Sequence, residues 1–365
     1  MSATKFQKAL VVQAIEKPLR LVQRPIPIPE PGWVLVKVAA AGINPHDQKG
    51  RDSALFIEPH LPNAILTQDI AGTVVSLGYG VTTFSPGDRI FGQSNVFGGP
   101  DQGGLQEYAL LHADYAARIP ENLSFDDAAT IPVNAVASFV ALFHESGLGL
   151  RPARFSIAGG ESGRVVDYSR EAIVVIGGGS NTGKFGLMFA KLAGFGKVIT
   201  IAGGTGDERK MDYLRSLGAT HIIDRRLTYL EIEREIRDLV GDSLIYAYDT
   251  VNTAANQDPG LTLLSSLRKG TLITLLRGGE VREDTALAKK GGYRKAQVLG
   301  VSHKHGEFAS EFWRRLPGWI GDRTVKGLGE VDVIEGLDVD AVNRVLDWYR
   351  DGRAVGKTHV HPSSL

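Results

Sequence analysis

The feature that most constrains the fold is a run of large apolar residues, 173–176, which is followed by a glycine cluster over 177–186 and by a second apolar stretch to residue 193. The first run is typical of a strand that is buried on both faces. Glycines in the turn let backbone N–H groups approach a ligand, and a helix N-terminus favours a phosphate. The sequence therefore predicts a strand, a phosphate-binding turn and a helix.

The glycine cluster has three interpretations. Gly178, Ser180 and Gly183 match a dinucleotide fingerprint in which serine replaces the middle glycine. The same two glycines with Lys184 match a P-loop, but Phe185 stands where a P-loop carries its magnesium-binding hydroxyl, which disfavours nucleotide hydrolysis. The third interpretation is a glycine-rich turn that binds no ligand. The segments that follow the cluster decide between them.

The composition excludes several classes of function. Lys and Arg together number 41, as do Asp and Glu, so no net charge favours nucleic acid or an anionic membrane. The chain has no Cys, which excludes disulfides, thiol nucleophiles and cysteine-ligated metal. No apolar run approaches the roughly 18 residues of a membrane span, and residues 1–15 lack the pattern of a secretion signal. We expect a soluble cytoplasmic protein that binds neither nucleic acid nor a membrane.

The length predicts two domains, because 365 residues exceed what one hydrophobic core normally supports. Before residue 124, short apolar strands alternate with proline- and glycine-containing turns, which is typical of an antiparallel β-barrel. After residue 171, strands alternate with helices, as in a doubly wound parallel α/β sheet of six strands. We predict a β-rich barrel domain over 1–135 and 327–365, and a Rossmann dinucleotide-binding domain over 136–326.

Local patterns predict several individual elements. Ser124, with Asp127 three residues later, indicates a helix N-terminus, and 135–143 continue as an apolar helix. The last strand of the parallel sheet is predicted over 296–301. Residues 151–170 are rich in glycine, serine and arginine without periodicity, and we predict an exposed insertion there.

Basic residues after the second parallel strand, 197–202, indicate which nicotinamide cofactor the fold would bind. NAD sites have an acidic residue at the end of this strand, whereas NADP sites have small residues and a basic side chain. Here Gly203 and Gly204 follow the strand, with Arg209 and Lys210 in the next helix. Arg225 and Arg226, after the third strand, would lie close by. Charge-assisted contacts to a 2′-phosphate favour NADPH; the alternative is that these are ordinary solvated charges.

Motifs along nearly the whole chain resemble those of the medium-chain dehydrogenase/reductase superfamily. They are Ala41-Gly42-Ile43-Asn44-Pro45 with Asp47, residues 69–75, residues 84–92, the 178–183 loop and residues 213–219. The resemblance implies a β-rich GroES-like barrel domain beside the Rossmann domain. Zinc-dependent members have a catalytic cysteine where this chain has Asn44, and Gly-His-Glu where it has Thr67-Gln68-Asp69. Without cysteine neither a catalytic nor a four-cysteine structural zinc site can form, so we expect no metal.

The chain therefore resembles the zinc-independent branch, which includes quinone reductases and enone reductases. Within that branch it most resembles the trans-acting enoyl reductases of fungal polyketide synthesis, which share the Asn-Pro-x-Asp-x-Lys loop and an insertion before the central strand. The implied substrate is a small or carrier-bound α,β-unsaturated compound, and the implied partner is a polyketide synthase. The implied reaction is hydride addition from NADPH to an activated C=C bond. Quinone reduction and non-catalytic NADPH binding, as a sensor or structural component, are the alternatives.

The resemblance and the basic residues together give a set of predicted site residues. The predicted cofactor-binding residues are His46, Asp47, Gln48, Gly178, Gly179, Ser180, Asn181, Thr182, Gly183, Gly203, Gly204, Arg209, Lys210, Arg225, Leu276, Arg277, Val355 and Gly356. Relatives usually have tyrosine at the place of Arg225. The predicted substrate residues are Asn134, Ala137 and Ser138, and Ala137 stands where many relatives have threonine.

Reduction of an activated C=C bond needs an oriented substrate and a stabilised enolate. Lys49 is the predicted contact to the substrate carbonyl or to the ribose, and Asn44 the predicted orienting residue. An exposed loop cation is the alternative interpretation of Lys49. The His303-x-His305 and His359-x-His361 pairs lack a third ligand in the sequence, so we predict no metal there either.

Overall fold

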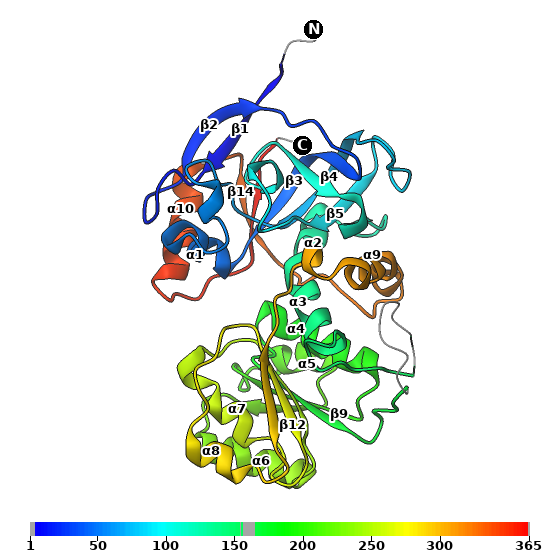
Figure 1. Ribbon diagram of the computed structural model, residues 1–365, viewed down its shortest axis with the longest axis vertical. Helices are drawn as coiled ribbons and strands as arrows, with labels where there is room; N and C mark the ends of the chain where they lie inside the picture. Colours follow the sequence, from blue (N-terminus) through cyan, green and yellow to red (C-terminus); the bar gives the residue numbers. More distant parts are fainter. Residues whose placement is uncertain (1–3, 154, 156–164, 364–365) are drawn as a thin grey trace. The chain divides into compact units, whose positions relative to one another are not determined.

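The computed structural model describes residues 4–153, 155 and 165–363 (Figure 1). By its internal contacts the chain divides into two compact units, Met1–Val133 with Val301–Leu365, and Asn134–Gly300. Within the described residues no helix is both long and apolar enough to cross a membrane. Half of the predicted 151–170 insertion, residues 154 and 156–164, lies outside the described residues.

The first unit is rich in β-structure, as the sequence predicts. Its main sheet has seven strands in the order β14-β15-β3-β4-β5-β7, with β6 paired to β3, and β1 and β2 form a separate antiparallel pair. Every pairing in the main sheet is antiparallel except that of β14 with β15, which is parallel. The strands are β1 (Phe6–Val11), β2 (Arg20–Pro25), β3 (Trp33–Ile43), β4 (Asp69–Leu77), β5 (Arg89–Gln93), β6 (Tyr108–His112), β7 (Ala116–Arg118), β14 (Asp332–Glu335) and β15 (Thr358–His361).

The sequence predicted only some of the helices of the first unit. Ser124 caps α2 as predicted, because its hydroxyl accepts the N–H of Asp127 at 2.9 Å. The helices are α1 (Pro45–Ser53), α2 (Phe125–Ala129), α9 (Gly306–Gly321) and α10 (Val339–Arg350), with 3₁₀ turns η1 (Glu58–His60), η2 (Pro100–Gln102), η3 (Ala113–Tyr115) and η5 (Ser302–Lys304).

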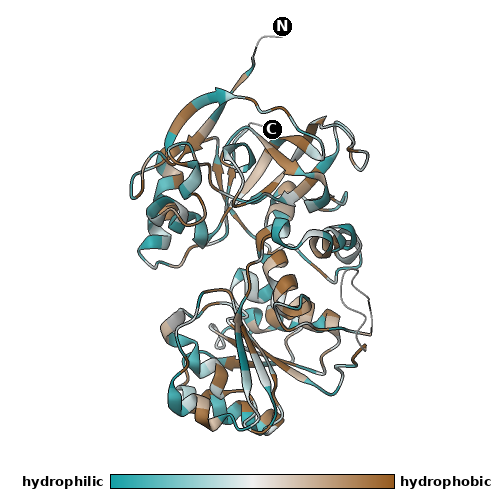
Figure 2. Cartoon of the chain, in the orientation of Figure 1, coloured by the Kyte–Doolittle hydropathy of each residue, from teal (hydrophilic) through white to brown (hydrophobic). Residues whose placement is uncertain are grey.

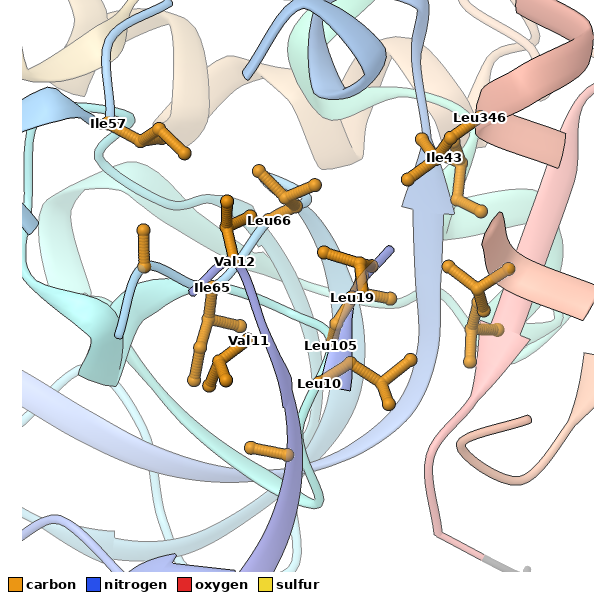
Figure 3. Packing of buried hydrophobic residues seen from close by; sticks show 14 of the residues in the cluster. Leu10, Val11, Val12, Leu19, Ile43, Ile57, Ile65, Leu66, Leu105 and Leu346 are labelled. Atoms are coloured by element: carbon orange, nitrogen blue, oxygen red, sulfur yellow. The ribbon is translucent and has the colours of Figure 1, made fainter. Parts of the chain in front are cut away.

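A core of the first unit lies between the β1 strand, the end of β3 and helix α10. Figure 3 shows Leu10, Ile43 and Leu346 among its side chains, and each of them is at most 1% exposed. Burying a side chain of this size contributes about 1.5–3 kcal/mol. Ile43 is the residue before Asn44, so this core fixes the chain at the point where the predicted site loop begins.

The second unit is the predicted doubly wound sheet. Its six strands are parallel throughout and run in the order β10-β9-β8-β11-β12-β13. They are β8 (Ala172–Ile176), β9 (Lys197–Ala202), β10 (His221–Asp224), β11 (Tyr246–Asp249), β12 (Gly270–Thr274) and β13 (Tyr293–Gln297). The helices are α3 (Pro132–Phe143), which begins in the first unit, α4 (Asn181–Ala193), α5 (Glu208–Leu217), α6 (Tyr229–Val240), α7 (Asp258–Thr262) and α8 (Glu283–Ala288), with the 3₁₀ turn η4 (Ala254–Asn256).

Hydropathy explains how these helices and strands are arranged within each unit. All five residues of β8 are buried, which is the pattern of a central parallel strand. Figure 2 shows hydrophobic residues along α3, whereas α6 combines hydrophobic and hydrophilic residues. In α6 the buried residues are Ile232 and Ile236, four positions apart on one helical face.

Two details differ from the sequence prediction. The last parallel strand is β13 at Tyr293–Gln297, three residues before the predicted start at 296, because Tyr293 to Gln297 pair with Gly270 to Thr274. The contact division falls at residue 300, whereas the predicted domain boundary lies at 326. The difference is α9, whose Trp313 packs edge-on against Phe91 of β5 at 5.7 Å and so joins the first unit. The predicted domain bounds stay a prediction.

Candidate active site

The glycine turn after β8 has the close approach that a phosphate-binding turn requires. Gly177 has a φ of +85°, a conformation that glycine adopts without strain. A Cβ atom on Gly178 would lie 2.0 Å from Thr200 Oγ1, and one on Gly183 would lie 2.1 Å from the Gly177 carbonyl oxygen. Only glycine fits at either position, so the N-terminus of α4 can pack directly against the end of β8.

A pair of hydroxyls fixes this turn at the place where the strand order reverses. Ser180 Oγ caps α4 by accepting the N–H of Gly183 at 3.0 Å. Thr250 Oγ1 donates to the Ile176 carbonyl at 2.9 Å, so the 2.9 Å contact between the two hydroxyls has Ser180 as donor. β8 and β11 are neighbours at the reversal. Ligands of open α/β sheets bind beside such a point. No sequence motif pointed to Thr250.

Two hydroxyls of predicted site residues, one assigned to the cofactor and one to the substrate, form hydrogen bonds inside the second unit. Thr182 Oγ1 donates to Asn134 Oδ1 at 2.9 Å, and Ser138 Oγ donates to the Thr182 carbonyl at 2.8 Å. The N–H groups of the first turn of α4, including that of Asn181, have no acceptor within the helix and so are the groups that would face a phosphate. Asn134, Ala137 and Ser138 are all buried, and their predicted contact with a substrate stays a prediction.

Two basic side chains lie over the glycines that follow β9. A Cβ atom on Gly203 would be 2.9 Å from Arg225 Nε, and one on Gly204 would be 3.0 Å from Lys210 Cδ. Lys210 Nζ is 3.9 Å from Asp207, and the side chain is 68% exposed. These two cations therefore stand at the end of β9, where the sequence predicts a 2′-phosphate.

The other two cations of this group are placed differently. The Arg209 side chain is 97% exposed. Arg226 pairs with Asp224 at 2.6 Å, and the Arg226 guanidinium, followed by the Thr205 hydroxyl, lowers the pKa of the Asp224 carboxyl. Because Arg226 already pairs with the carboxylate of Asp224, Lys210 and Arg225 are the better candidates to bind a phosphate.

Four further predicted cofactor residues lie close to the ends of other strands. The Leu276 carbonyl, two residues after β12, accepts from Gln257 Nε2 at 3.0 Å, and Arg277 is exposed. Val355 and Gly356 precede β15.

Sequence reasoning missed Asp249 at the end of β11, which accepts the backbone N–H groups of Val251 and Asn252 at 3.1 and 3.0 Å. Burial raises the pKa of the Asp249 carboxyl.

The predicted site loop of the first unit is the start of α1. Pro45 occupies the first turn, and Asp47 accepts the backbone N–H of Asn44 at 2.7 Å and that of Thr67 at 2.9 Å. Burial raises the pKa of the Asp47 carboxyl, while nearby His46 acts in the opposite direction. Thr67 has a φ of +68°, which is unusual for a β-branched residue. The carboxylate of Asp47 thus ties the start of α1 to a strained turn before β4.

A buried ion pair lies directly behind this loop. Lys357, the residue directly before β15, donates from Nζ to Asp69 Oδ2 at 2.8 Å, to Asn44 Oδ1 at 3.1 Å and to the Ile43 carbonyl at 3.3 Å. The side chains of Lys357 and Asp69 are 3% and 0% exposed. Asn44 Nδ2 also donates to Asp69 Oδ2 at 2.7 Å. Both ends of the Asn44 amide are therefore turned towards the ion pair, which favours a positioning role over direct contact with a substrate.

The exposed side of α1 carries the other predicted residues. His46 Nε2 contacts Gln68 Oε1 at 2.5 Å, and Gln48 Nε2 donates to Asp52 at 2.8 Å. Lys49 is exposed, and residues at positions 46 and 49 are neighbours on a helix surface. The structure thus places His46 and Lys49 together on α1, while Asn44 and Asp47 are buried.

The histidine pairs have partners that the sequence did not reveal. His359 Nδ1 and His361 Nε2 both contact Asp126 Oδ1, at 2.8 and 2.9 Å. His303 lies 4.5 Å from the Tyr115 ring and stacks on Trp33 at 5.8 Å. Within the described part of the chain, no group of three or more histidine and acidic residues has the geometry to hold a metal ion.

Comparison with known proteins agrees with this architecture. Residues 30–121 match the alcohol dehydrogenase GroES-like domain. The chain is 28% identical over 363 residues to the trans-enoyl reductase ACTTS2 of Alternaria alternata, covering 96% of this chain and 97% of that one. It is 31% identical over 317 residues to the trans-enoyl reductase grgB of a Penicillium species, covering 82% and 83%. A mycobacterial protein solved in complex with NADPH has a similar fold, with a TM-score of 0.72, 20% identity and 98% and 100% coverage.

Proposed function

Because the chain belongs to the trans-enoyl reductase family, we propose that it is a zinc-independent, NADPH-dependent reductase of activated C=C bonds. The observation that carries the proposal is the arrangement at Asn44 and Gln68. These two amides stand where zinc-dependent relatives have metal ligands, and both are bonded to other side chains. A substrate would then be activated by conjugation and by hydrogen bonds from the protein.

The residues present fit a dinucleotide that carries a 2′-phosphate. Gly178 and Gly183 let the end of β8 and the N-terminus of α4 pack closely together, and the helix dipole favours the negative charge of a phosphate at that N-terminus. Lys210 and Arg225 would hold the 2′-phosphate over Gly203 and Gly204. The relation to a protein solved with NADPH supports the same choice. When bound, NADPH supplies the hydride.

The chain's own residues would orient the acceptor and stabilise the charge that develops on its carbonyl oxygen. Lys49 is exposed on α1 beside His46, so its ammonium can donate to an oxygen of the substrate or the ribose. Gln68 contacts His46 and so fixes the imidazole ring. Asn44 and Asp47 hold the first turn of α1 in place. The proton that completes the reduction comes from a water molecule or from Lys49.

The names of the relatives support a proposal for the substrate class. Relatives named trans-enoyl reductases point to an enoyl thioester, free or bound to a carrier, and to a polyketide synthase as partner. The balanced formal charge of the chain, 41 basic against 41 acidic residues, gives no global attraction to a charged partner. Recognition of a carrier would therefore depend on a local surface.

The test is oxidation of NADPH by the purified protein with enoyl thioesters, simple enones and quinones. We expect turnover with an enoyl thioester, and with deuterium at the transferred position of NADPH we expect the label at the β-carbon of the product. Lys49→Ala should lower kcat by about 10²-fold, the size of effect seen for the loss of one charge-stabilising donor. Lys17→Ala, which alters another exposed lysine of the same unit, should have no effect.

Other outcomes would assign the protein elsewhere. Turnover of quinones alone would make it a quinone reductase. Tight binding of NADPH with no oxidation across the panel would make it a sensor or a structural component. Equal affinity for NADPH and NADH would contradict the role of Lys210 and Arg225.

A further inference from the structure

We infer that Lys357 is a positioning residue for the reaction, although it lies 313 residues from Asn44 in the chain. Its ammonium has three acceptors, which come from Asp69, Asn44 and Ile43. An ammonium has three N–H donors, so each is used. The inference rests on the proposed function, because positioning is defined by the reaction that it serves.

The first consequence of this contact concerns α1. Asn44 precedes the helix, and its side chain bridges Lys357 and Asp69. The backbone N–H of the same residue donates to Asp47, which is held by Thr67. The direction in which α1 leaves β3, and with it the place of Lys49, is therefore set by a charge directly before the last strand of the chain.

The second consequence concerns α3. Asp69 has two oxygens, and Oδ1 accepts the backbone N–H of Val133 at 2.7 Å, in the first turn of α3. A carboxylate at this position is favoured by the helix dipole. Lys357 neutralises the same carboxylate at Oδ2, 2.8 Å away. One ion pair thus anchors the first turns of two helices, α1 and α3, that carry predicted site residues.

Space around the ammonium is closely fitted. A Cβ atom on Gly42 would lie 2.9 Å from Lys357 Nζ and 2.9 Å from Asp69 Cβ. Gly42 pairs with His359 of β15, two residues beyond Lys357. Any side chain at position 42 would displace the ion pair, so glycine is required at this point of β3.

A purely structural ion pair and a positioning ion pair predict different results for a charge-neutral double variant. Lys357→Met alone leaves Asp69 as a buried unpaired charge, which is strongly destabilising. Lys357→Met with Asp69→Asn removes both charges and keeps an oxygen that accepts from Val133. If the pair only stabilises the fold, the double variant regains both thermal stability and kcat. If it positions the site, stability returns while kcat stays low.

The experiment measures kcat and KM for an enoyl thioester and for NADPH, thermal unfolding, and hydrogen exchange at 44–53 and 133–137. For the double variant we expect kcat to fall about 10- to 100-fold, as for a displaced catalytic group, with KM for NADPH within 3-fold and faster exchange at 44–53. Unchanged kcat and exchange would overturn the inference. Should the double variant not fold, Lys357→Arg decides instead: because the larger guanidinium displaces the start of α1, positioning predicts a lower kcat in a protein that is still folded at the assay temperature, and an unchanged kcat overturns the inference.

A matched control is available in the second unit. Lys289 is also a buried lysine, 6% exposed, and its ammonium donates to the Leu264 and Thr262 carbonyls. Lys289→Met should lower thermal stability and leave kcat unchanged; an equal loss of kcat would mean that any buried lysine has this effect. If the unaltered protein reduces no substrate, the proposed function fails, and hydrogen exchange alone tests whether Lys357 holds α1.

Discussion

Two groups of charged residues differ in how far the protein itself completes them. In the first unit, the Lys357 ammonium and the Asp69 carboxylate are buried 2.8 Å apart, and Asn44 bridges them. In the second unit, Lys210 is largely exposed and lies 3.9 Å from Asp207, with Arg225 stretched along Gly203. The first group is complete without a ligand, whereas the second presents positive charge to whatever binds at the end of β9. Damage to the first should therefore appear in stability, and damage to the second in affinity.

The largest expected effect is on the buried pair. Asp69→Ala leaves the Lys357 ammonium without a carboxylate and removes the acceptor of Val133, so the free energy of unfolding should fall by about 3–5 kcal/mol. Urea denaturation measures this change. Glu208→Ala removes an exposed partner of Arg215 and should leave the free energy of unfolding almost unchanged. A similar small loss for both variants would contradict the comparison.

A buried group with no partner should show an intermediate effect that depends on pH. Among the described residues neither ring nitrogen of His303 has a hydrogen-bond partner, and burial, followed by the charge of nearby His112, lowers the pKa of His303 from 6.5 to about 4. The unfolded chain then binds the proton first, so stability is full above pH 6.5 and falls as the pH drops towards 4. The loss should be on the order of 2–3 kcal/mol.

Unfolding by urea across this pH range, for the unaltered protein and for His303→Phe, measures the contribution. The phenylalanine variant keeps the ring contacts with Trp33 and Tyr115 and cannot take up the proton. Between pH 6.5 and 4, unfolding of this variant should take up one proton fewer than unfolding of the unaltered protein, so its free energy of unfolding should depend less steeply on pH. Parallel curves for the two proteins would exclude His303 as the group that titrates.

The smallest effect on stability is expected at the exposed cations. Lys210→Ala should raise KM for NADPH about 10-fold, since a charge-assisted hydrogen bond contributes about 1.5–3 kcal/mol, and should leave the KM for NADH nearly unchanged. The free energy of unfolding should stay within about 0.5 kcal/mol. Arg209→Ala, at a side chain that is 97% exposed, is the comparator and should change KM less. An equal change in KM for NADPH and for NADH would contradict the assignment of the 2′-phosphate to this site.

The parts of the structure that local patterns determine were predictable from the sequence. The buried run of β8, the glycine turn and α4 form as expected, and Ser124 caps α2. Helix α9 was not predicted, because Pro317 and glycines interrupt its pattern, although its Phe312 and Trp313 are buried.

The polar contacts of the site were the least predictable part. Lys357 and Asp69 are 288 residues apart, and Ser180 and Thr250 are 70 apart. No periodicity or spacing links such residues, since their distance depends on how whole strands pair. Lys357 directly precedes the terminal strand, and a lysine is ordinarily exposed, so no local signal indicated that it is buried. The predicted role of Asn44 shows the same limit, because the direction of its amide depends on that distant lysine.

The hydroxyl pair of Ser180 and Thr250 has a kinetic consequence. Because Ser180 caps α4 and is itself held by Thr250, the turn has its shape before any dinucleotide arrives. Binding then requires no ordering of this loop, and the entropy that such ordering costs is avoided. We expect the association rate of the cofactor to be governed by diffusion and by the charges at its entrance, with little contribution from rearrangement of the turn.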